Sequence, residues 1–302
     1  MKRCVHELKT PIHRQLAAAI LLTLGLSANA AVNDVLPADF FPLATGTTTF
    51  AAYAYDRQFS GPYSRGNKLL DGELSSQILA LRAGYFIEVA GMPVSLVAVL
   101  PWSQNSVSPA PLARALGEEA RGLGDLRFGA TGWLLANRES GEYLGITGLL
   151  FIPSGDYDNR QVLNAGENRY KLSLNGGWIK PLGNGFIFEL LPEVAWFGDN
   201  NDYIGSRTLA QKTAYAVSSY LRYRATPNWQ FHLGGQVNRG GETRINAVDQ
   251  NNAPDNSRLM LGTTYLTDDK SHQWIFRVAR DVEVKSSFKT DSEIMLRYLK
   301  MF

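Results

Sequence analysis

The chain has 302 residues, of which 45% are hydrophobic and 19% charged, with a formal net charge of +2. This composition excludes an intrinsically disordered chain, which would carry more charge and fewer aromatic residues, and it does not indicate a nucleic-acid-binding surface. Beyond the N-terminus no stretch reaches the ~18 consecutive apolar residues of a transmembrane helix, so a helical membrane protein is excluded too.

The first 30 residues have the pattern of a bacterial secretory signal peptide. A basic region that contains Lys2 and Arg3 is followed by an apolar stretch from Leu16 to Leu26, and then by the small residues Ala28 and Ala30. This order of basic, apolar and small residues predicts export and cleavage after Ala30. Cleavage also removes the only cysteine, so the exported protein has no disulfide.

The rest of the chain consists of stretches of about ten residues in which apolar and polar positions alternate, which is the period of a β-strand. In one clear example, Trp229, Phe231 and Leu233 share one face, and Gln230 and His232 lie on the other. Twelve such strands are predicted, and they begin near Thr47, Leu79, Val94, Leu126, Tyr143, Tyr170, Phe186, Thr213, Trp229, Leu259, Trp274 and Ile294.

The connections between these strands alternate between short and long. Short links fall at residues 90–93, 136–142, 181–185, 225–228 and 267–272, and longer polar links at 57–72, 103–121, 154–167, 198–208, 239–256 and 283–289. Short periplasmic turns and longer extracellular loops are typical of outer-membrane barrels. A soluble β-sandwich has no reason to keep this order, and among β structures lipid permits only closed sheets. The sequence therefore predicts an all-β fold, a transmembrane antiparallel β-barrel of about 12 strands.

We expect three segments: a signal peptide over residues 1–30, a periplasmic N-terminal segment over 31–45, and an outer-membrane β-barrel over 46–302. The expected location is the outer membrane of a Gram-negative bacterium. The expected partners are outer-membrane lipid, the barrel assembly machinery and a small-molecule solute. No nucleic acid, no cofactor and no metal is expected.

Aromatic residues mark the expected membrane interfaces. Trp102 and Trp196 lie at the loop ends of their strands, and Trp178, Trp229 and Trp274 lie at the turn ends. All five are on the apolar face, as in the aromatic girdles of membrane barrels, whereas Trp133 is on the other face.

The last strand ends on an aromatic residue. Ile294, Leu296, Tyr298, Lys300 and Phe302 share one face, which resembles the terminal strand by which barrels are recognised for assembly. We interpret Tyr298 and Phe302 as this assembly signal. Lys300 departs from the pattern, but its charge can extend to the membrane interface.

The opposite face carries charges that are expected to line the lumen. The basic and acidic candidates are Arg82, Arg127, Lys171, Arg222, Arg258, Arg277, Arg297, Glu88, Asp125, Glu189, Glu193 and Asp281. Either they pair with one another and fill a narrow barrel, or they line a water-filled path and set its ion preference. Glu189 and Glu193 are the pair expected to affect that preference most. Leu190 is expected to face lipid, and Leu191 to face a lumen that tolerates charge.

Four short motifs resemble those of a known family. They are Asp39-Phe40-Phe41-Pro42-Leu43 with Gly46-Thr47, Leu100-Pro101-Trp102, Gly122-Leu123-Gly124-Asp125 and Pro153-Ser154-Gly155-Asp156. Together they are similar to an outer-membrane β-barrel family that is named for the meta-pathway of phenol degradation and described as transporters. The resemblance implies passive uptake of a small solute, aromatic or hydrophobic, and it implies no catalytic residues.

Two glycine- and aspartate-containing segments have other interpretations, which we do not favour. The motif that ends at Asp125 is not followed by the Lys-Ser/Thr of a phosphate-binding loop, and it precedes a strand. Asp156 and Asp158 lack the spacing of a calcium-binding loop, so an exposed polar loop is the better interpretation.

Two other functions remain open. The first is a structural or surface-interaction barrel, which would have self-packed loops and a plugged lumen. The second is an outer-membrane hydrolase, which needs a nucleophilic serine beside a histidine. After signal removal the histidines are His232, on a polar face, and His272, which follows Ser271 in a periplasmic turn. Neither position favours catalysis or a metal cluster, so we expect a channel and not an enzyme.

Overall fold

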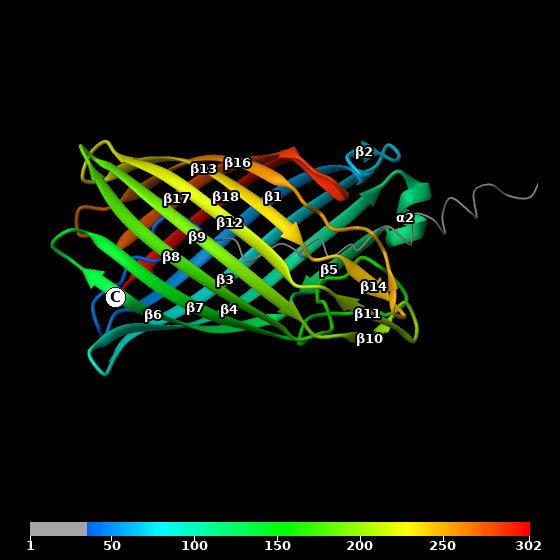
Figure 1. Cartoon of the computed structure of the whole chain (residues 1–302), viewed down its shortest axis with the longest axis horizontal. Helices are drawn as coiled ribbons and strands as arrows, with labels where there is room; N and C mark the ends of the chain where they lie inside the picture. The colour runs from blue at the N-terminus through cyan, green and yellow to red at the C-terminus, as the bar shows by residue number, and fades with distance from the viewer. Residues whose placement is uncertain (1–34) are drawn as a thin grey trace, which may run out of the picture.

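The computed structural model describes residues 35–302, so the predicted signal peptide lies outside the described residues. Within this range twelve antiparallel strands close into a barrel, as predicted (Figure 1). The barrel strands are β1 (Thr48–Ser64), β3 (Glu73–Val89), β4 (Met92–Ser108), β6 (Leu126–Asn137), β7 (Glu142–Ile152), β8 (Lys171–Gly183), β9 (Phe186–Phe197), β12 (Ala214–Arg224), β13 (Trp229–Gly240), β16 (Ser257–Leu266), β17 (His272–Glu283) and β18 (Ser287–Met301). Pairing of β18 with β1, for example Leu296 opposite Ala54, closes the sheet.

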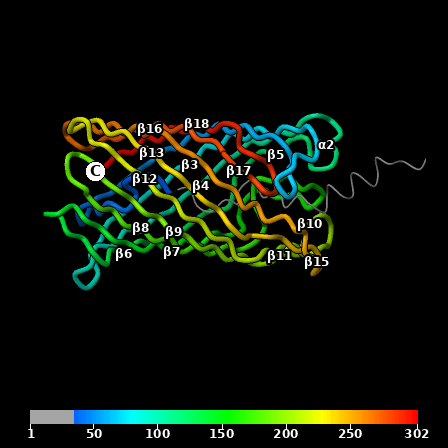
Figure 2. The backbone as a smooth tube through the Cα atoms, turned by 45° about the horizontal axis from the view of Figure 1, so that its top comes forward, coloured from blue at the N-terminus to red at the C-terminus, as the bar shows by residue number. Residues whose placement is uncertain are grey.

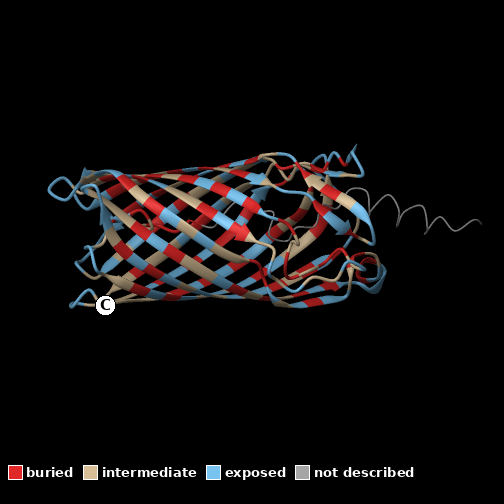
Figure 3. Ribbon diagram, turned by 90° about the horizontal axis from the view of Figure 1, so that it is seen from below, coloured by how far each residue is buried: buried red, intermediate tan, exposed pale blue. Residues whose placement is uncertain are grey.

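Alternate residues of each strand point outward and inward, which gives the banded burial pattern of Figure 3. On β9, Phe186 and Trp196 are exposed on the outer surface, whereas Glu189 and Leu191 are buried inside. Other exposed apolar residues of the outer surface are Leu81, Phe128, Leu172, Leu233, Leu261 and Leu296. An apolar outer surface is what a barrel presents to lipid. Separately, none of the helices in residues 35–302 is long and apolar enough to cross a membrane.

The two ends of the barrel differ. Short turns and the C-terminus lie at one end, and the longer connections lie at the other (Figures 1 and 2). At the loop end the strands are longer than predicted: β1 continues to Ser64, so half of the expected loop 57–72 is strand, and β3 begins at Glu73, before the predicted start near Leu79. The prediction stopped too early because, in such an extension, polar residues occupy both faces and the alternation disappears.

The connections at the loop end pack together into a cap. The cap contains α2 (Ala110–Leu116), β2 (Asn67–Lys68), β5 (Glu119–Leu123), β10 (Asn200–Tyr203), β11 (Arg207–Gln211), β14 (Thr243–Ile245) and β15 (Val248–Asp249). Four of these strands form a separate small sheet in the order β10-β11-β14-β15. The cap packs on the adjoining ends of the barrel strands through an apolar core. This core contains Leu74, Val107, Leu112, Leu116, Leu163, Tyr203, Leu209 and Phe288. The loops are therefore self-packed, the feature expected of a closed barrel.

Residues 35–43, which we call the N-terminal insert, lie inside the barrel near its turn end. Leu36 is fully buried against Ile275 and Met295. Phe40 belongs to a buried cluster on the barrel wall, and a Cβ at Gly177 would lie 2.0 Å from its ring. Only glycine therefore leaves room for this ring on β8.

This arrangement corrects two expectations. The structure places residues 35–43 within the barrel, although 31–45 was predicted as a periplasmic segment. Leu191 does face inward, but it packs in the same apolar cluster as Phe40 and not in a polar lumen. The physical reason is that the insert brings its own apolar side chains, and their burial against the wall is favourable.

Candidate functional site

Charged side chains of the wall bind the insert at two points. Glu189, fully buried on β9, accepts hydrogen bonds from the Ala38 backbone N–H at 3.1 and 3.2 Å and pairs with Arg222 at 2.5 Å. On the other side of the lumen, Arg297 of β18 pairs with Asp39 at 2.5 Å. Three of the predicted lumenal charges therefore hold the insert in place.

Two neutral side chains fix the insert backbone. The Trp133 indole N–H of β6 donates to the Phe40 carbonyl at 2.8 Å, and the Tyr220 hydroxyl of β12 donates to the Val35 carbonyl at 3.2 Å. Trp133 is the tryptophan that the sequence placed on the opposite face from the others, and it is 3% exposed. The insert is thus tied to β6, β9, β12 and β18, which surround it.

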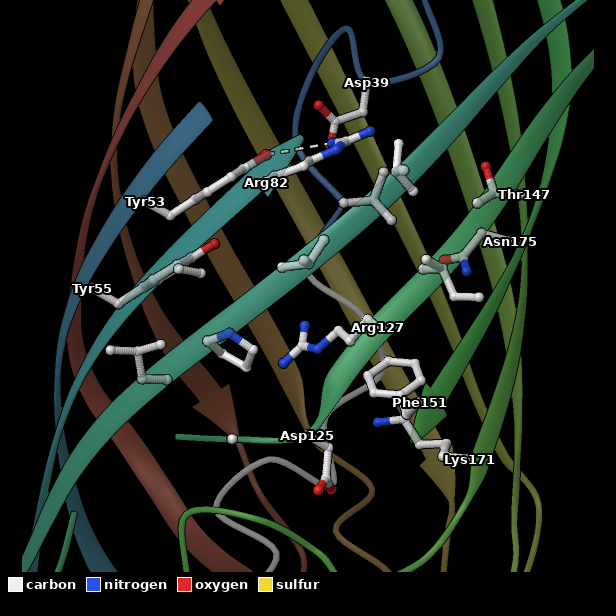
Figure 4. Close-up of a pocket in the computed structure, with 18 of the residues that line it drawn as sticks. Asp39, Tyr53, Tyr55, Arg82, Asp125, Arg127, Thr147, Phe151, Lys171 and Asn175 are labelled. Atoms are coloured by element: carbon white, nitrogen blue, oxygen red, sulfur yellow. Dashed lines mark hydrogen bonds between the residues drawn. The ribbon is translucent and has the colours of Figure 1, made fainter. Parts of the chain in front are cut away.

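The insert divides the lumen into two cavities. The loop-side cavity has a volume of about 170 Å³ and reaches Asp125 and Lys171 near the cap. The turn-side cavity has a volume of about 500 Å³ and reaches the short turns at the other end of the barrel. Both cavities are lined by Asp39, Tyr53 and Arg82, and the Tyr53 hydroxyl accepts a hydrogen bond from Arg82 at 3.4 Å (Figure 4). These residues mark the place where the two cavities approach each other.

One wall of the lumen carries a dense ion-pair network. Glu293 of β18 is fully buried and pairs with Arg57 of β1 at 2.7 Å, with Arg277 of β17 at 2.6 Å and with Arg258 of β16 at 3.4 Å. Arg258 also pairs with Asp281 at 3.0 Å. The structure thus brings together three predicted lumenal residues, Arg258, Arg277 and Asp281, in one network with Glu293 in which their charges neutralise one another.

Sequence reasoning missed the centre of this network. Arg57 was assigned to a loop and Glu293 to the residues before the last strand, because both predicted strands were too short. A usable signal was present: Glu293 has the same parity as Arg297, and Arg57 the same parity as Tyr53 and Tyr55. Extending the first predicted strand past Arg57 and starting the last predicted strand before Glu293 would have placed both side chains inside.

The opposite wall carries cations without such partners. Arg127, Phe151, Lys171 and Phe197 form a row across β6, β7, β8 and β9, because each is paired in register with the next. The Lys171 Nζ lies 4.0 Å from the centre of the Phe151 ring, and the Arg127 guanidinium carbon lies 4.9 Å from it. Figure 4 shows Arg127 and Lys171 on either side of Phe151 in the loop-side cavity.

Two of the family-like motifs bind each other at the loop end. Asp125 accepts the backbone N–H of Gly155 at 3.0 Å, and Asp156 accepts that of Leu123 at 2.8 Å, so each motif's aspartate satisfies an amide of the other motif. Asp125 also accepts the N–H of Glu167 at 2.8 Å. Burial raises the pKa of the Asp125 carboxyl, although the amide hydrogen bonds oppose that rise. These contacts give the motifs a structural role in the cap.

The remaining lumenal candidates have different environments. Glu193 is buried and accepts a hydrogen bond from the Ser173 hydroxyl at 2.6 Å. Glu88 is exposed at the turn end of β3, where no hydrogen bond or ion pair ties it to the insert or the network. Glu88 is thus separate from the other lumenal candidates.

The predicted interface tryptophans lie on the outer surface. Trp196, Trp229 and Trp274 are exposed, while Trp102 and Trp178 are half-buried. Trp102 is paired with the exposed Leu79, and partners across a strand pair share a face. Their role as membrane girdles stays a prediction, as does the assembly role of Tyr298 and Phe302.

The two described histidines have structural contacts. His272 accepts or donates at 2.7 Å to the Tyr298 hydroxyl, whereas the Ser271 hydroxyl donates to Asp269 at 2.6 Å. Lys300 Nζ lies 3.2 Å from the Ser271 hydroxyl and 3.1 Å from His272 Nε2, so it contacts both side chains, and no hydrogen bond joins Ser271 to the His272 ring. His232 is buried and packs edge-to-face with Tyr220. Residues 35–302 contain no group of three or more His, Cys, Asp or Glu side chains placed to hold a metal ion.

Comparisons with known proteins agree with the barrel. The chain is similar to the crystal structure of the COG4313 outer membrane channel from Pseudomonas putida F1, with 26% identity and a TM-score of 0.83 over 89% of this chain and 100% of that one. It shares its fold with the β domain of the Bordetella autotransporter BrkA (13% identity, TM-score 0.54, 86% of this chain and 100% of that one). The transport unit of the Escherichia coli autotransporter AIDA-I is similar in fold too (10% identity, TM-score 0.52, 94% and 97%). None of these three is described as an enzyme.

The family assignment follows from the sequence match. A search of curated proteins gave no match. The family described as "Putative MetA-pathway of phenol degradation" matches residues 59–298, which is most of the chain. This protein therefore belongs to that family of outer-membrane β-barrels, as its motifs indicated.

Proposed function

We propose that this protein is an outer-membrane channel through which a small solute, aromatic or hydrophobic, passes the N-terminal insert by diffusion. One observation carries the proposal: two cavities occupy the lumen on either side of the insert and share Asp39, Tyr53 and Arg82 in their lining. A barrel that served only as a scaffold has no need of cavities that approach each other along its axis.

The lining of the cavities supports an apolar or aromatic solute. On the turn side, Phe41, Phe86, Tyr143 and Ile187 contribute to the wall. Ligand sites for small organic molecules are mostly apolar, with a few placed polar groups that fix orientation. The similar P. putida protein is described as a channel, which supports the same class of function here.

The insert is the narrow point of the proposed path. It is held by Glu189, Arg297, Trp133 and Tyr220, so a solute reaches the other cavity only where side chains such as Arg82 move. Side-chain rotamer changes are fast, whereas release of the whole insert requires several buried contacts to break. We therefore propose a low basal flux.

A closed structural or surface-interaction barrel is the second candidate. The self-packed cap, with Leu112, Leu116 and Leu163 in its core, favours it. In that case the cavities are sealed voids, and the exposed side of the cap is the functional surface.

We also propose that the chain reaches the outer membrane after cleavage behind Ala30, and that the barrel assembly machinery recognises the strand ending in Tyr298 and Phe302. Membrane fractionation and N-terminal sequencing of the purified protein test the location and the cleavage. Replacement of Phe302 by Ser tests the signal, since a loss of assembled barrel is expected.

Single-channel recording and liposome flux test the proposed function. The full-length exported chain is reconstituted, and we expect small conductance steps together with entry of toluene or phenol above that of protein-free liposomes. Neither conductance nor flux, with a correctly folded barrel, would leave the closed structural barrel as the better account.

A further inference from the structure

Two of the cations that line the loop-side cavity, Arg127 and Lys171, form no ion pair with the carboxylates of the wall. Lys171 is 4% exposed and lines this cavity together with Arg127. In the part of the chain that the structure describes, neither side chain forms an ion pair, and the Arg127 Nε has no hydrogen-bond partner. A cation that is withdrawn from water without an ion-pair partner costs stability, so the buried Lys171 beside the half-buried Arg127 indicates a function outside folding.

The carboxylates Asp125 and Glu167 of the same cavity attract these cations, but their hydrogen bonds and ion pairs go to other groups. Glu167 pairs with Arg169 at 2.6 Å. Asp125 accepts two backbone amides at the cap, and Glu193 accepts the hydroxyl of Ser173. A negative group that comes from outside the protein would therefore form the first direct ion pair with these two cations.

The rest of the cavity is suited to an apolar group. The Phe151 ring lies between the two cations, and the neighbouring wall is formed by Val97, Val99, Pro101 and Leu149. The volume of about 170 Å³ is close to the ~150 Å³ of an engineered cavity that holds benzene. The cavity thus accepts one small ring, with space for a short polar substituent.

We propose that the loop-side cavity binds a small aromatic monocarboxylate. Its carboxylate pairs with Arg127 and Lys171 from the cavity, and its ring contacts Phe151 and the apolar wall. The proposal rests on the proposed channel function and names its solute class. A neutral hydrocarbon leaves both cations unneutralised, and an inorganic anion leaves the apolar wall uncovered, so a molecule with both parts fits best.

Fluorine NMR with the full chain in detergent tests this proposal through binding, independently of flux. The probes are para-fluorobenzoate, para-fluorotoluene and trifluoroacetate. We expect saturation transfer and line broadening for para-fluorobenzoate at concentrations where the other two show none. Equal signals for para-fluorotoluene would overturn the role of the cations, and equal signals for trifluoroacetate would overturn the role of the apolar wall.

Matched variants locate the site. R127Q and K171Q should each weaken para-fluorobenzoate binding about 10-fold or more, the loss expected for a charge-assisted hydrogen bond. K180Q is the control, because Lys180 lies on the same strand, pairs with Glu142 at 3.0 Å and is outside the cavity. Equal affinities in the R127Q, K171Q and K180Q variants would refute the site. Since binding is measured without transport, a barrel that binds the probe but conducts nothing refutes only the channel.

Discussion

On the wall formed by β16, β17, β18 and β1, a buried carboxylate is shared by three guanidinium groups, whereas on the wall formed by β6, β7 and β8 two cations face a cavity with an aromatic ring between them. Both walls present arginines on the inward parity, so their sequence patterns are alike. The two walls differ in the residue that lies opposite the cation on the neighbouring strand: Glu293 lies opposite Arg57, whereas Phe151 lies opposite both Arg127 and Lys171. Paired charges stabilise the barrel, and charges left unpaired are available to a solute.

The largest effect is expected from Glu293→Ala. Removal of this carboxylate leaves Arg57 and Arg277 buried without their partner, and breaking a buried pair in this way costs about 3–5 kcal/mol. Urea unfolding in micelles, followed by tryptophan fluorescence, measures the loss. The control is Glu88→Ala, because Glu88 is exposed and its replacement should change stability by less than about 0.5 kcal/mol. Similar losses in both variants would contradict the paired wall.

The second-largest loss of stability is expected from a charge placed in the wall that packs against the insert. Leu191→Arg places a charge in the apolar cluster around Phe40, and we expect a loss at least as large as that of Leu190→Arg on the outer face, about 2–4 kcal/mol. The same unfolding measurement applies. If Leu191→Arg left the free energy of unfolding unchanged, the sequence-based expectation that Leu191 faces a polar lumen would be supported instead.

A smaller effect is expected from Gly177→Ala. The new methyl group would lie 2.0 Å from the Phe40 ring, so the ring must leave its site, at a cost of about 1–3 kcal/mol. Gly148→Ala is the matched control, because a Cβ there meets nothing within 4 Å. Differential scanning calorimetry compares the two variants. A stable Gly177→Ala protein would mean that the ring is not held against β8.

The smallest effect is expected for Arg127→Gln combined with Lys171→Gln. Neither cation has an ion-pair partner among the described residues. The free energy of unfolding should therefore either increase or fall by no more than about 0.5 kcal/mol. If the free energy of unfolding fell by about 2 kcal/mol or more, the loss would approach that of a broken buried ion pair, and this wall would be paired as well.

The barrel itself could be predicted because its period, turn lengths and strand number are local or countable properties of the sequence. The inward parity of β9, with Glu189 and Leu191 on one face, followed from the same alternation. What each inward residue contacts could not be predicted. Glu293 and Arg57 are far apart in the sequence, and their contact depends on the register of β18 against β1, which no local pattern encodes.

The insert was missed for a different reason. Leu36 and Phe40 lie in a short apolar stretch without a strand or helix period, so their own positions do not indicate where they are buried. The indole of Trp133, on the opposite parity from the other tryptophans, was the available signal, and it binds the Phe40 carbonyl. A buried aromatic donor on an inward face requires a partner inside the barrel.

Single-channel conductance in planar bilayers tests most directly whether the insert divides a conducting lumen. Wild-type protein and the Gly148→Ala control should show the same small steps, and Gly177→Ala should show larger ones, because displacement of Phe40 joins the two cavities. Identical conductance in all three proteins, or none in any of them, would contradict the account.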